Sequence, residues 1–248
     1  MIRTGILLAL FAGIAAAQSP QSNAPDSLLG ISLGNAAHLG VPMQIVLLLT
    51  LMTLLPAAIM SITPFLRITV VLHFLRQALG TQTTPSNQVL IGLSLFLTIL
   101  IMQPVAADVY RLGWEPLERG ALGPEQAFEQ GTRPLKDFLL RFAREKDIAL
   151  FLEVSRAEPP VTPRDLELKI LVPAYILSEL KTAFQIGAVL FLPFLIIDII
   201  VASVTLSVGM VQLPPVMISA PFKVLLFVLV DGWNLVVGSL VRSFYVNA

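Results

Sequence analysis

Residues 183–210 read AFQIGAVLFLPFLIIDIIVASVTLSVGM and contain one charged side chain, Asp198, near the middle of the stretch. At 1.5 Å per residue, a helix of this length is long enough to cross ~30 Å of hydrocarbon. Three further stretches have the same apolar character and lie at 41–66, 89–109 and 222–246. The sequence therefore predicts an all-α fold with four long hydrophobic helices.

The composition of the whole chain is typical of a membrane protein. Of its 248 residues, 56% are hydrophobic and 13% are charged, whereas an average soluble domain has ~25% charged residues. Lysine and arginine number 16 and are balanced by 16 acidic residues, so the chain lacks the basic excess that nucleic-acid binding requires. The absence of cysteine excludes thiolate metal sites and a cysteine nucleophile.

The first seventeen residues have the layout of a secretory signal peptide. Arg3 precedes an apolar segment at 5–14, and small residues follow it. We expect cleavage before Gln18, with Ala15 and Ala17 as the small residues of the cleavage site. An uncleaved anchor helix is the alternative, but the apolar segment falls short of the ~20 residues that a span needs. Residues 18–40 are expected to form a flexible exported segment.

Charged residues concentrate in one part of the chain, because 21 of the 32 lie between positions 111 and 169. Such a segment favours water over lipid. We expect residues 111–172 to form a small helical domain inserted between the second and third hydrophobic helices. After Pro134, apolar residues recur at helical spacing and predict a surface amphipathic helix. They are Leu135, Phe138, Leu139 and Phe142.

The connection between the first two hydrophobic stretches carries Arg67 and Arg76 as its only full charges, with His73 beside them. Positively charged loops favour the cytoplasmic side of a membrane. We therefore expect this connection in the cytoplasm and the inserted domain in the periplasm. The hydrophobic helices would form two hairpins, at 41–110 and 173–248.

The apolar stretches contain charged residues, among them Asp198, Lys223 and Asp231. A charge at the bilayer centre costs ~2.5 to 3.5 kcal/mol, so these side chains must face protein or water. Lys223 and Asp231 are eight residues apart and would project from one face of a continuous helix, too distant to pair directly. Asp198 has two candidate partners, Lys223 across an antiparallel hairpin or a charge on a neighbouring subunit. A proton relay through Asp198 is a further alternative to a structural role.

The short connection between the last two hydrophobic stretches has no charge and contains Met210. Methionine is unbranched and adapts to irregular contacts. The connection is therefore either a soft plug or a simple tight turn.

Sequence patterns for catalysis are missing. There is no HExxH zinc motif and no GxxxxGK[ST] phosphate-binding loop. The two histidines, His38 and His73, are far apart in the sequence and adjoin no carboxylate pair. We expect no enzymatic activity, no cofactor and no metal site, so any movement of a substrate must draw its energy from a partner or a gradient.

Several long blocks closely resemble the FliP family of the type III export gate. They are LVPAYILSELKTAFQIGAVLFLPF at 171–194, LIIDIIVASV at 195–204, APFKVLLFVLVDGWNLVVGSL at 220–240, RITVVLHFLRQALGTQTTPSNQVLIGLSLFLTILIMQPV at 67–105 and PLKDFLLRFAREKDIALF at 134–151. The resemblance extends from about Val41 to Tyr245.

This resemblance implies a cleaved signal peptide, four hydrophobic helices and a periplasmic domain between the second and third. It also implies several copies of the chain assembling with FliQ and FliR at the centre of the flagellar basal body, in the bacterial inner membrane. Surrounding ring proteins would hold much of the complex at or above the membrane plane. Other export-apparatus proteins, unfolded exported proteins and membrane lipid are the remaining expected partners.

In the FliP family, a methionine-rich loop between the third and fourth helices contributes to the constriction that closes the channel. The matching positions here are Met210, Val211 and Gln212, of which only Met210 keeps the sulfur-containing side chain. We expect apolar Val211 and hydrogen-bonding Gln212 to complete the gate. Glu179 and Lys181 lie in the SELKTAFQ block and are expected to make inter-subunit contacts.

The sequence thus predicts a pore-forming, non-enzymatic subunit of a flagellar-type export channel. The equivalent subunit of a virulence injectisome and a proton-coupled transporter remain as alternatives. An intramembrane hydrolase and an assembly scaffold without a pore of its own also remain.

Overall fold

The computed structural model describes residues 41–245 except 82, 159 and 210–213. In that part of the chain no residue lies in a β-strand, so the predicted all-α class is confirmed. The predicted signal peptide with Ala15 and Ala17, and the segment 18–40, lie outside the described residues. Helices α3 to α10 belong to a compact unit that begins at Ile45.

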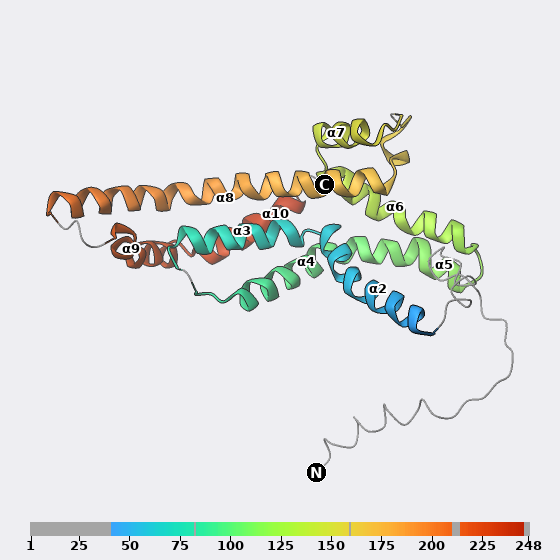
Figure 1. The fold of residues 1–248 in the computed structure, drawn as a ribbon, viewed down its shortest axis with the longest axis horizontal. Coiled ribbons are helices and arrows are strands. Elements are labelled where there is room, and N and C mark those ends of the chain that lie inside the picture. Colours follow the sequence, from blue (N-terminus) through green and yellow to red (C-terminus); the bar gives the residue numbers. More distant parts are fainter. Residues whose placement is uncertain (1–40, 82, 159, 210–213, 246–248) are drawn as a thin grey trace, which may run out of the picture. The chain divides into compact units, whose positions relative to one another are not determined.

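The helices follow one another as Figure 1 labels them. Their bounds are α2 Val41–Ser61, α3 Phe65–Ala78, α4 Asn87–Val109, a π-helical turn Tyr110–Trp114, α5 Glu115–Glu118, α6 Pro124–Phe142, α7 Glu145–Ser155, a 3₁₀ turn Pro163–Asp165, α8 Leu168–Ser207, α9 Pro215–Leu229 and α10 Gly232–Tyr245.

The first predicted hydrophobic helix is divided. Helix α2 ends at Ser61, and Pro64 then occupies the N-cap position of α3, where its missing N–H does no harm. The residues expected to form a cytoplasmic connection form α3 instead. Its apolar residues repeat at helical spacing and make the centre of the core, because four of its large side chains are fully buried. These are Ile68, Val71, Leu72 and Leu75.

The second hydrophobic helix runs on into the predicted inserted domain. Helix α4 continues without a break through the π-helical turn into α5. Gly113 in this turn meets Gly131 of α6 so closely that a Cβ on Gly113 would lie 2.8 Å from the Gly131 Cα. Only glycine permits this approach of the two helices.

The amphipathic helix expected after Pro134 is present, but it begins earlier, so that Pro134 lies inside α6. Its inner face is the predicted one. The ring of Phe138 packs 6.1 Å from that of Tyr175 on α8, and the ring of Phe142 packs 5.2 Å from that of Phe244 on α10. Helix α6 therefore joins the predicted inserted domain to the core.

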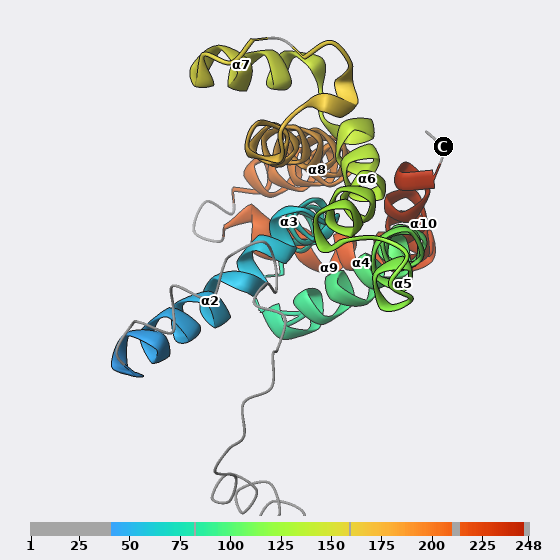
Figure 2. The same cartoon turned by 90° about the vertical axis from the view of Figure 1, so that its right-hand side faces the viewer.

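Helix α8 begins at Leu168, well before the predicted start at Ala183. The reason is that its first turns also have an apolar stripe, with Ile170, Leu171, Ala174 and Tyr175 all buried. Helix α8 packs against α3, α6, α7 and α9, and Figure 2 looks along it with α3 at its side.

The fourth predicted hydrophobic helix is two helices, α9 and α10, which meet at an angle of 65°. Asp231 lies at this break with φ of +52°, a conformation that aspartate tolerates better than most residues. Gly232 follows, and a Cβ there would lie 2.2 Å from the ring of Phe227. The chain therefore turns at this point because glycine lets Phe227 close over the backbone.

Three described helical segments are long and apolar enough to cross a membrane, namely Pro42–Ser61, Asn87–Glu118 and Leu168–Ser207. The bent pair α9–α10 makes a fourth if it counts as one span. The described chain thus contains three to four candidate spans, against the four predicted. Helix α3 packs against both α4 and α8.

Candidate functional site

One candidate site lies in the hairpin of α8 and α9, which leads to the segment 210–213. Asp198 comes from α8, and Ser219 and Lys223 come from the same face of α9, one turn apart. The Ser219 hydroxyl donates to Oδ1 of Asp198 at 2.5 Å, and the Lys223 ammonium donates to Oδ2 at 2.6 Å. Both carboxylate oxygens are therefore bound by α9.

This ion pair is largely withdrawn from solvent. The Lys223 side chain is 3% exposed and the Asp198 side chain 27% exposed. A buried charge is tolerated when a countercharge and hydrogen bonds replace its water. Of the two partners considered for Asp198, the structure contains the one within the chain.

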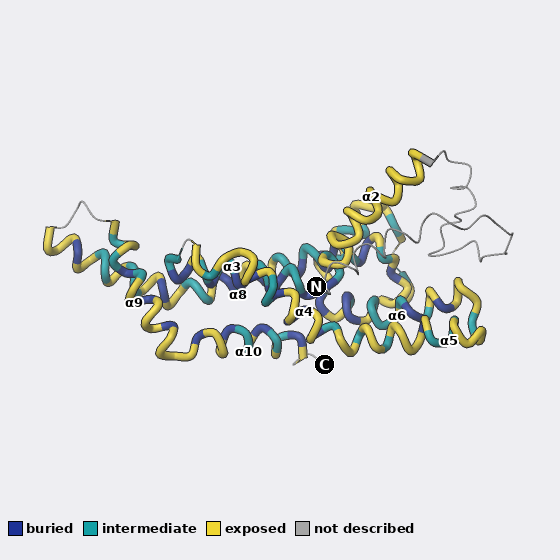
Figure 3. The backbone as a smooth tube through the Cα atoms, turned by 90° about the horizontal axis from the view of Figure 1, so that it is seen from below, coloured by how far each residue is buried: buried dark blue, intermediate teal, exposed yellow. Residues whose placement is uncertain are grey.

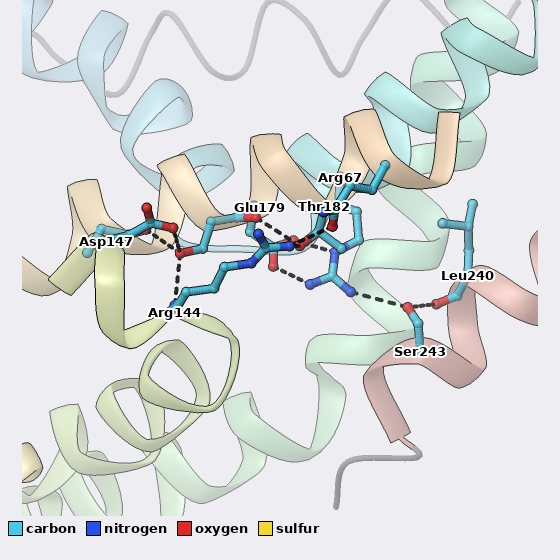
Figure 4. A network of polar contacts seen from close by, with 10 residues as sticks. Arg67, Arg144, Asp147, Glu179, Thr182, Leu240 and Ser243 are labelled. Atoms are coloured by element: carbon cyan, nitrogen blue, oxygen red, sulfur yellow. Dashed lines mark hydrogen bonds and ion pairs between the residues drawn. The ribbon is translucent and has the colours of Figure 1, made fainter. Parts of the chain in front are cut away.

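A second polar cluster ties three helices together inside the core, as Figure 4 shows. Arg67 of α3 binds Glu179 of α8 through two parallel hydrogen bonds, one of them from Nε to Oε2 at 2.7 Å. Its Nη1 donates to the Ser243 hydroxyl of α10 at 3.2 Å. Both charged side chains are buried, at 5% and 0% exposure.

Two aromatic rings lie close to the same guanidinium group. The Arg67 Cζ atom lies 4.1 Å from the ring centroid of Phe244 on α10 and 5.3 Å from that of Phe142 on α6. Stacking of a planar guanidinium on aromatic faces adds cation–π attraction to the ion pair. Arg67 is therefore the contact that α3, α6, α8 and α10 share.

A third cluster, also drawn in Figure 4, joins α7 to α8. The buried Asp147 accepts hydrogen bonds from the Ser178 hydroxyl, at 2.7 Å, and from the Lys181 ammonium. Arg144, at the start of α7, donates its backbone N–H to Ser178 and its guanidinium to Gln185 at 2.7 Å. Together these contacts hold α7 against two turns of α8.

The electrostatics of Asp147 follow from this setting. Burial by itself raises the pKa of its carboxyl, but the hydrogen bonds from Lys181 and Ser178 and the charges of Lys181 and Arg144 outweigh burial. The net result is a pKa below the ordinary value of an aspartate. Asp147 is thus held as a carboxylate, which keeps the α7–α8 contact charged.

The expectation for Glu179 and Lys181 was contact with other subunits. Within the chain, Glu179 is paired with Arg67 and Lys181 with Asp147. These intrachain partners already compensate both charges, so neither residue needs a second subunit to explain its position.

Asp231 differs from its predicted setting. The idea that Lys223 and Asp231 share one face of a continuous helix is wrong, because α9 ends at Leu229. Asp231 is exposed and accepts a hydrogen bond from the Asn234 amide at 3.1 Å. It therefore marks the bend between α9 and α10 and is not a buried charge of this chain.

Sequence reasoning missed Arg67 and Asp147 as partners of the predicted residues. Arg67 was assigned to a loop, although the apolar residues at 68, 71, 72 and 75 have helical spacing that predicts a buried face. Asp147 had no comparable signal, since it is one of many charges in its segment. The buried position of Arg67 also weakens the prediction that the connection between the first two hydrophobic stretches is cytoplasmic. That prediction used the positive charges of Arg67 and Arg76, and of these two only Arg76 is accessible.

The gate positions Met210, Val211 and Gln212 lie outside the described residues. A metal site is likewise not evident in the described part of the chain, where no three His, Asp or Glu side chains gather. The clusters that can be described are therefore ion pairs and hydrogen bonds that hold helices in register.

Comparison with known proteins identifies the family. The model of the FliP family matches residues 48–240, which include the charged residues of all three clusters. The chain belongs to the FliP family. The resemblance seen in the sequence blocks is thereby confirmed.

Three relatives of this FliP-family chain are flagellar biosynthetic proteins that match it over most of both chains. It is 50% identical over 202 residues to the flagellar biosynthetic protein FliP of Pectobacterium carotovorum subsp. carotovorum, covering 82% of this chain and 78% of that protein. It is 49% identical to FliP of Bacillus subtilis, covering 81% and 91%. The match to FliP of Caulobacter vibrioides is 44% identical and covers 98% and 92%.

Proposed function

We propose that this chain is a core subunit of the flagellar type III protein export gate in the bacterial inner membrane. The observation that carries the proposal is the family match across 48–240, together with relatives that are flagellar biosynthetic proteins. The candidate membrane helices support a location in the membrane. The inserted segment, with α6 and α7, is proposed to face the periplasm.

The gate is proposed to be the connection between α8 and α9. The contacts of Asp198 with Ser219 and Lys223 fix the register of the two helices, and thereby the ends from which Met210, Val211 and Gln212 extend. Several copies of the chain, each supplying one such loop, would close a pore at rest. An unfolded protein pushed by a partner would displace the loops.

FliQ and FliR are the proposed direct partners, and other export-apparatus proteins and the basal-body ring surround them. The chain itself is proposed to be non-enzymatic. The hydroxyls that could serve a hydrolase, Ser203 and Ser207, donate to carbonyls of their own helix at 2.8 and 2.7 Å, which favours a structural role for them.

Two other functions use the same residues. An injectisome subunit would have the same fold, but the relatives named above are flagellar proteins, which supports the flagellar assignment. A proton-coupled transporter would need Asp198 to release Lys223 during its cycle. The double contact of Asp198 with α9 argues against such a cycle.

The assembly is tested by native mass spectrometry of the chain co-expressed with FliQ and FliR in mild detergent. We expect a discrete particle with several copies of this chain and both partners. A monomer or a homodimer that ignores the partners would contradict the proposal and bring the transporter forward.

The gate is tested by deleting Met210, Val211 and Gln212. We expect the particle to assemble as before while cells that carry it leak small ions, measured as loss of membrane potential. A matched deletion of Ser155, Arg156 and Ala157 in the inserted segment controls for a general effect of shortening the chain. Unchanged ion tightness in an assembled particle would overturn the gate.

A further inference from the structure

The end of the α8–α9 hairpin packs differently from the rest of α8. The ring of Phe191 on α8 lies 6.3 Å from that of Phe74 on α3. Three residues further on, the ring of Phe194 lies 6.4 Å from that of Phe227 on α9. Helix α8 thus passes from one neighbour to the other at Pro193, which lies between these two rings. We call residues 194–207 of α8 and 215–229 of α9 the distal hairpin.

Each end of the distal hairpin joins the rest of the chain where regular helical hydrogen bonding is interrupted. Pro193 lies inside α8 and lacks the N–H that would bond to the carbonyl four residues earlier. At the other end, α9 meets α10 at an angle of 65°. Sharp bends of helices concentrate at such positions. These two positions are therefore where the distal hairpin can bend away from the core.

Within the distal hairpin the two helices are bound to each other. The buried residues of α9 are Ser219, Lys223 and Phe227, which are spaced four apart and form one face. Two of them bind Asp198 of α8. The other faces of α9 are exposed or half-buried, as Figure 3 shows. A displacement of α8 beyond Pro193 therefore carries α9 with it.

A second contact of α9 lies at its start. Gly80, in the turn between α3 and α4, has a φ of +73°, and a Cβ there would lie 3.5 Å from the Cβ of Ala220 and 4.0 Å from the Cγ1 of Val216. These two residues are one helical turn apart and share a face of α9. Figure 1 shows the end of α3 beside α9. The turn thus supports the first turns of α9, which follow residues 210–213 in the sequence.

The turn itself is held by the core. Leu79 is buried at 5% exposure. Nη1 of Arg76 on α3 donates to the Pro85 carbonyl at 3.3 Å and to Oδ1 of Asn87, the first residue of α4, at 2.6 Å. The Thr81 hydroxyl donates to the Arg76 carbonyl at 3.3 Å. These bonds join the two ends of the turn and fix the position against which α9 rests.

The contact at Gly80 is weaker than the contact between α9 and α8. The nearest atoms around Gly80 are carbons of Ala220 and Val216, and dispersion between single pairs of atoms is small. Asp198 instead holds α9 through an ion pair and a hydrogen bond. Helix α9 therefore separates from the turn more easily than from α8.

From these observations we infer that the turn between α3 and α4 is a stop for the distal hairpin. The first turns of α9 rest on Gly80 while the channel is closed. They leave it, together with the end of α8, when an exported chain passes. The inference rests on the proposed export function, and it adds the contact that holds the distal hairpin in its closed position.

A disulfide can lock this contact. The chain has no cysteine, and a Cβ separation of 3.5 Å lies within the ~3.5–4.5 Å range of disulfides. Gly80→Cys and Ala220→Cys are combined in the full-length chain, in cells that make the whole export apparatus. Diamide forms the bond and dithiothreitol breaks it. The disulfide is detected by its mobility in a non-reducing gel, and export by the amount of a flagellar protein in the medium.

We expect the oxidised double variant to form the disulfide within the chain and to export at least tenfold less than the same protein after reduction. Absence of the disulfide would overturn the contact, and a disulfide that leaves export unchanged would overturn its release. The unmodified chain controls for the reagents. Gly120→Cys controls for a cysteine at positive φ, because Gly120 has a φ of +67° and its Cβ position has no such neighbour within 4 Å. Both controls should export alike before and after oxidation.

A second variant disturbs the contact in the opposite direction. Ala220→Leu adds bulk between α9 and Gly80, so it should move α9 off the stop and make cells lose membrane potential several-fold faster. Ala188→Leu, the same substitution at an exposed position of α8, is the matched control and should leave the cells ion-tight. An assembled Ala220→Leu particle that is as tight as this control would overturn the stop.

The stop and the gate fail in different ways. If the proposed gate is wrong, deletion of Met210, Val211 and Gln212 leaves cells ion-tight. If the stop alone is wrong, that deletion leaks while Ala220→Leu stays tight and the oxidised double variant still exports.

Discussion

Two ion pairs in the described part of the chain, the buried Arg67–Glu179 and the partly exposed Lys223–Asp198, each compensate charges between helices but differ in geometry. Arg67 binds its carboxylate through two parallel hydrogen bonds, lies over the ring of Phe244 and contacts three other helices. Lys223 makes a single contact between the two helices of one hairpin. A guanidinium fork fixes orientation, whereas an ammonium is a point charge on a flexible stem. The comparison indicates that the Arg67–Glu179 pair fixes the orientation of its helices more specifically than the Lys223–Asp198 pair does.

The largest effect is expected from Arg67→Met, which leaves Glu179 buried without a countercharge. Removing one partner of a buried pair costs about 3–5 kcal/mol, so the variant should lose most of its folded population in detergent, measured as Tm and as protein recovered. The Tm of Arg67→Lys should lie between that of Arg67→Met and that of the unmodified protein, because lysine keeps the positive charge but cannot form the two parallel hydrogen bonds.

The control for this variant is Arg133→Ala, which breaks an exposed ion pair with Glu129. Exposed pairs contribute about 0–1 kcal/mol, so its Tm should stay close to that of the unmodified protein. An Arg67→Met protein as stable as this control would contradict this role of the Arg67–Glu179 pair.

A smaller effect is expected at the hairpin, because water screens the partly exposed Asp198. Asp198→Asn and Lys223→Met should each cost about 2 kcal/mol, and the double variant should cost less than the sum by about 1–2 kcal/mol of coupling energy. Thermal unfolding of the four proteins measures this coupling. Additive losses would mean that the two charges do not interact in the folded protein.

The smallest effect concerns Asp147 and depends on pH. Its folded-state pKa is lowered, so its stabilisation is present in full above the ordinary aspartate value of 3.8 and is lost as the pH falls through the lower folded value. Asp147→Asn should lower the free energy of unfolding by about 1.5 kcal/mol at pH 7, the scale of a charged hydrogen bond.

That difference should persist to pH 5 and shrink below about pH 4, the region in which an ordinary aspartate titrates. Asp137→Asn is the matched control, because Asp137 pairs with Arg164 while both are exposed. If the two aspartate variants behave alike at every pH, the α7–α8 contact is no stronger than a surface pair.

The sequence predicted the features that depend on composition and on long periodic runs. The all-α class, the inner face of α6 and the Asp198–Lys223 possibility follow from apolar spacing and from the cost of unpaired charges in apolar surroundings. These features depend on local residue spacing or on the matching registers of two helices joined by a short connection. They could be read without knowing which helices meet.

Other features depend on contacts between distant residues, which no local pattern encodes. Arg67 and Glu179 are 112 residues apart, and no pattern in the sequence near Arg67 predicts that Glu179 is its partner. The bend at Asp231 depends on the approach of Phe227 to Gly232. A prediction from hydropathy alone therefore treats α9 and α10 as one helix. The apolar run at 41–66 is likewise two helical segments where one was predicted, because the chain breaks before Pro64, which begins α3.

Helix α8 has a mechanical consequence. Its 40 residues extend about 60 Å, twice the hydrocarbon thickness, so an upright α8 carries half of its length out of the bilayer. Glu179 and Asp198 lie about 28 Å apart along this one rod. A displacement at the Asp198 end of this helix reaches Glu179 only across Pro193, which lacks the N–H that would close one helical hydrogen bond.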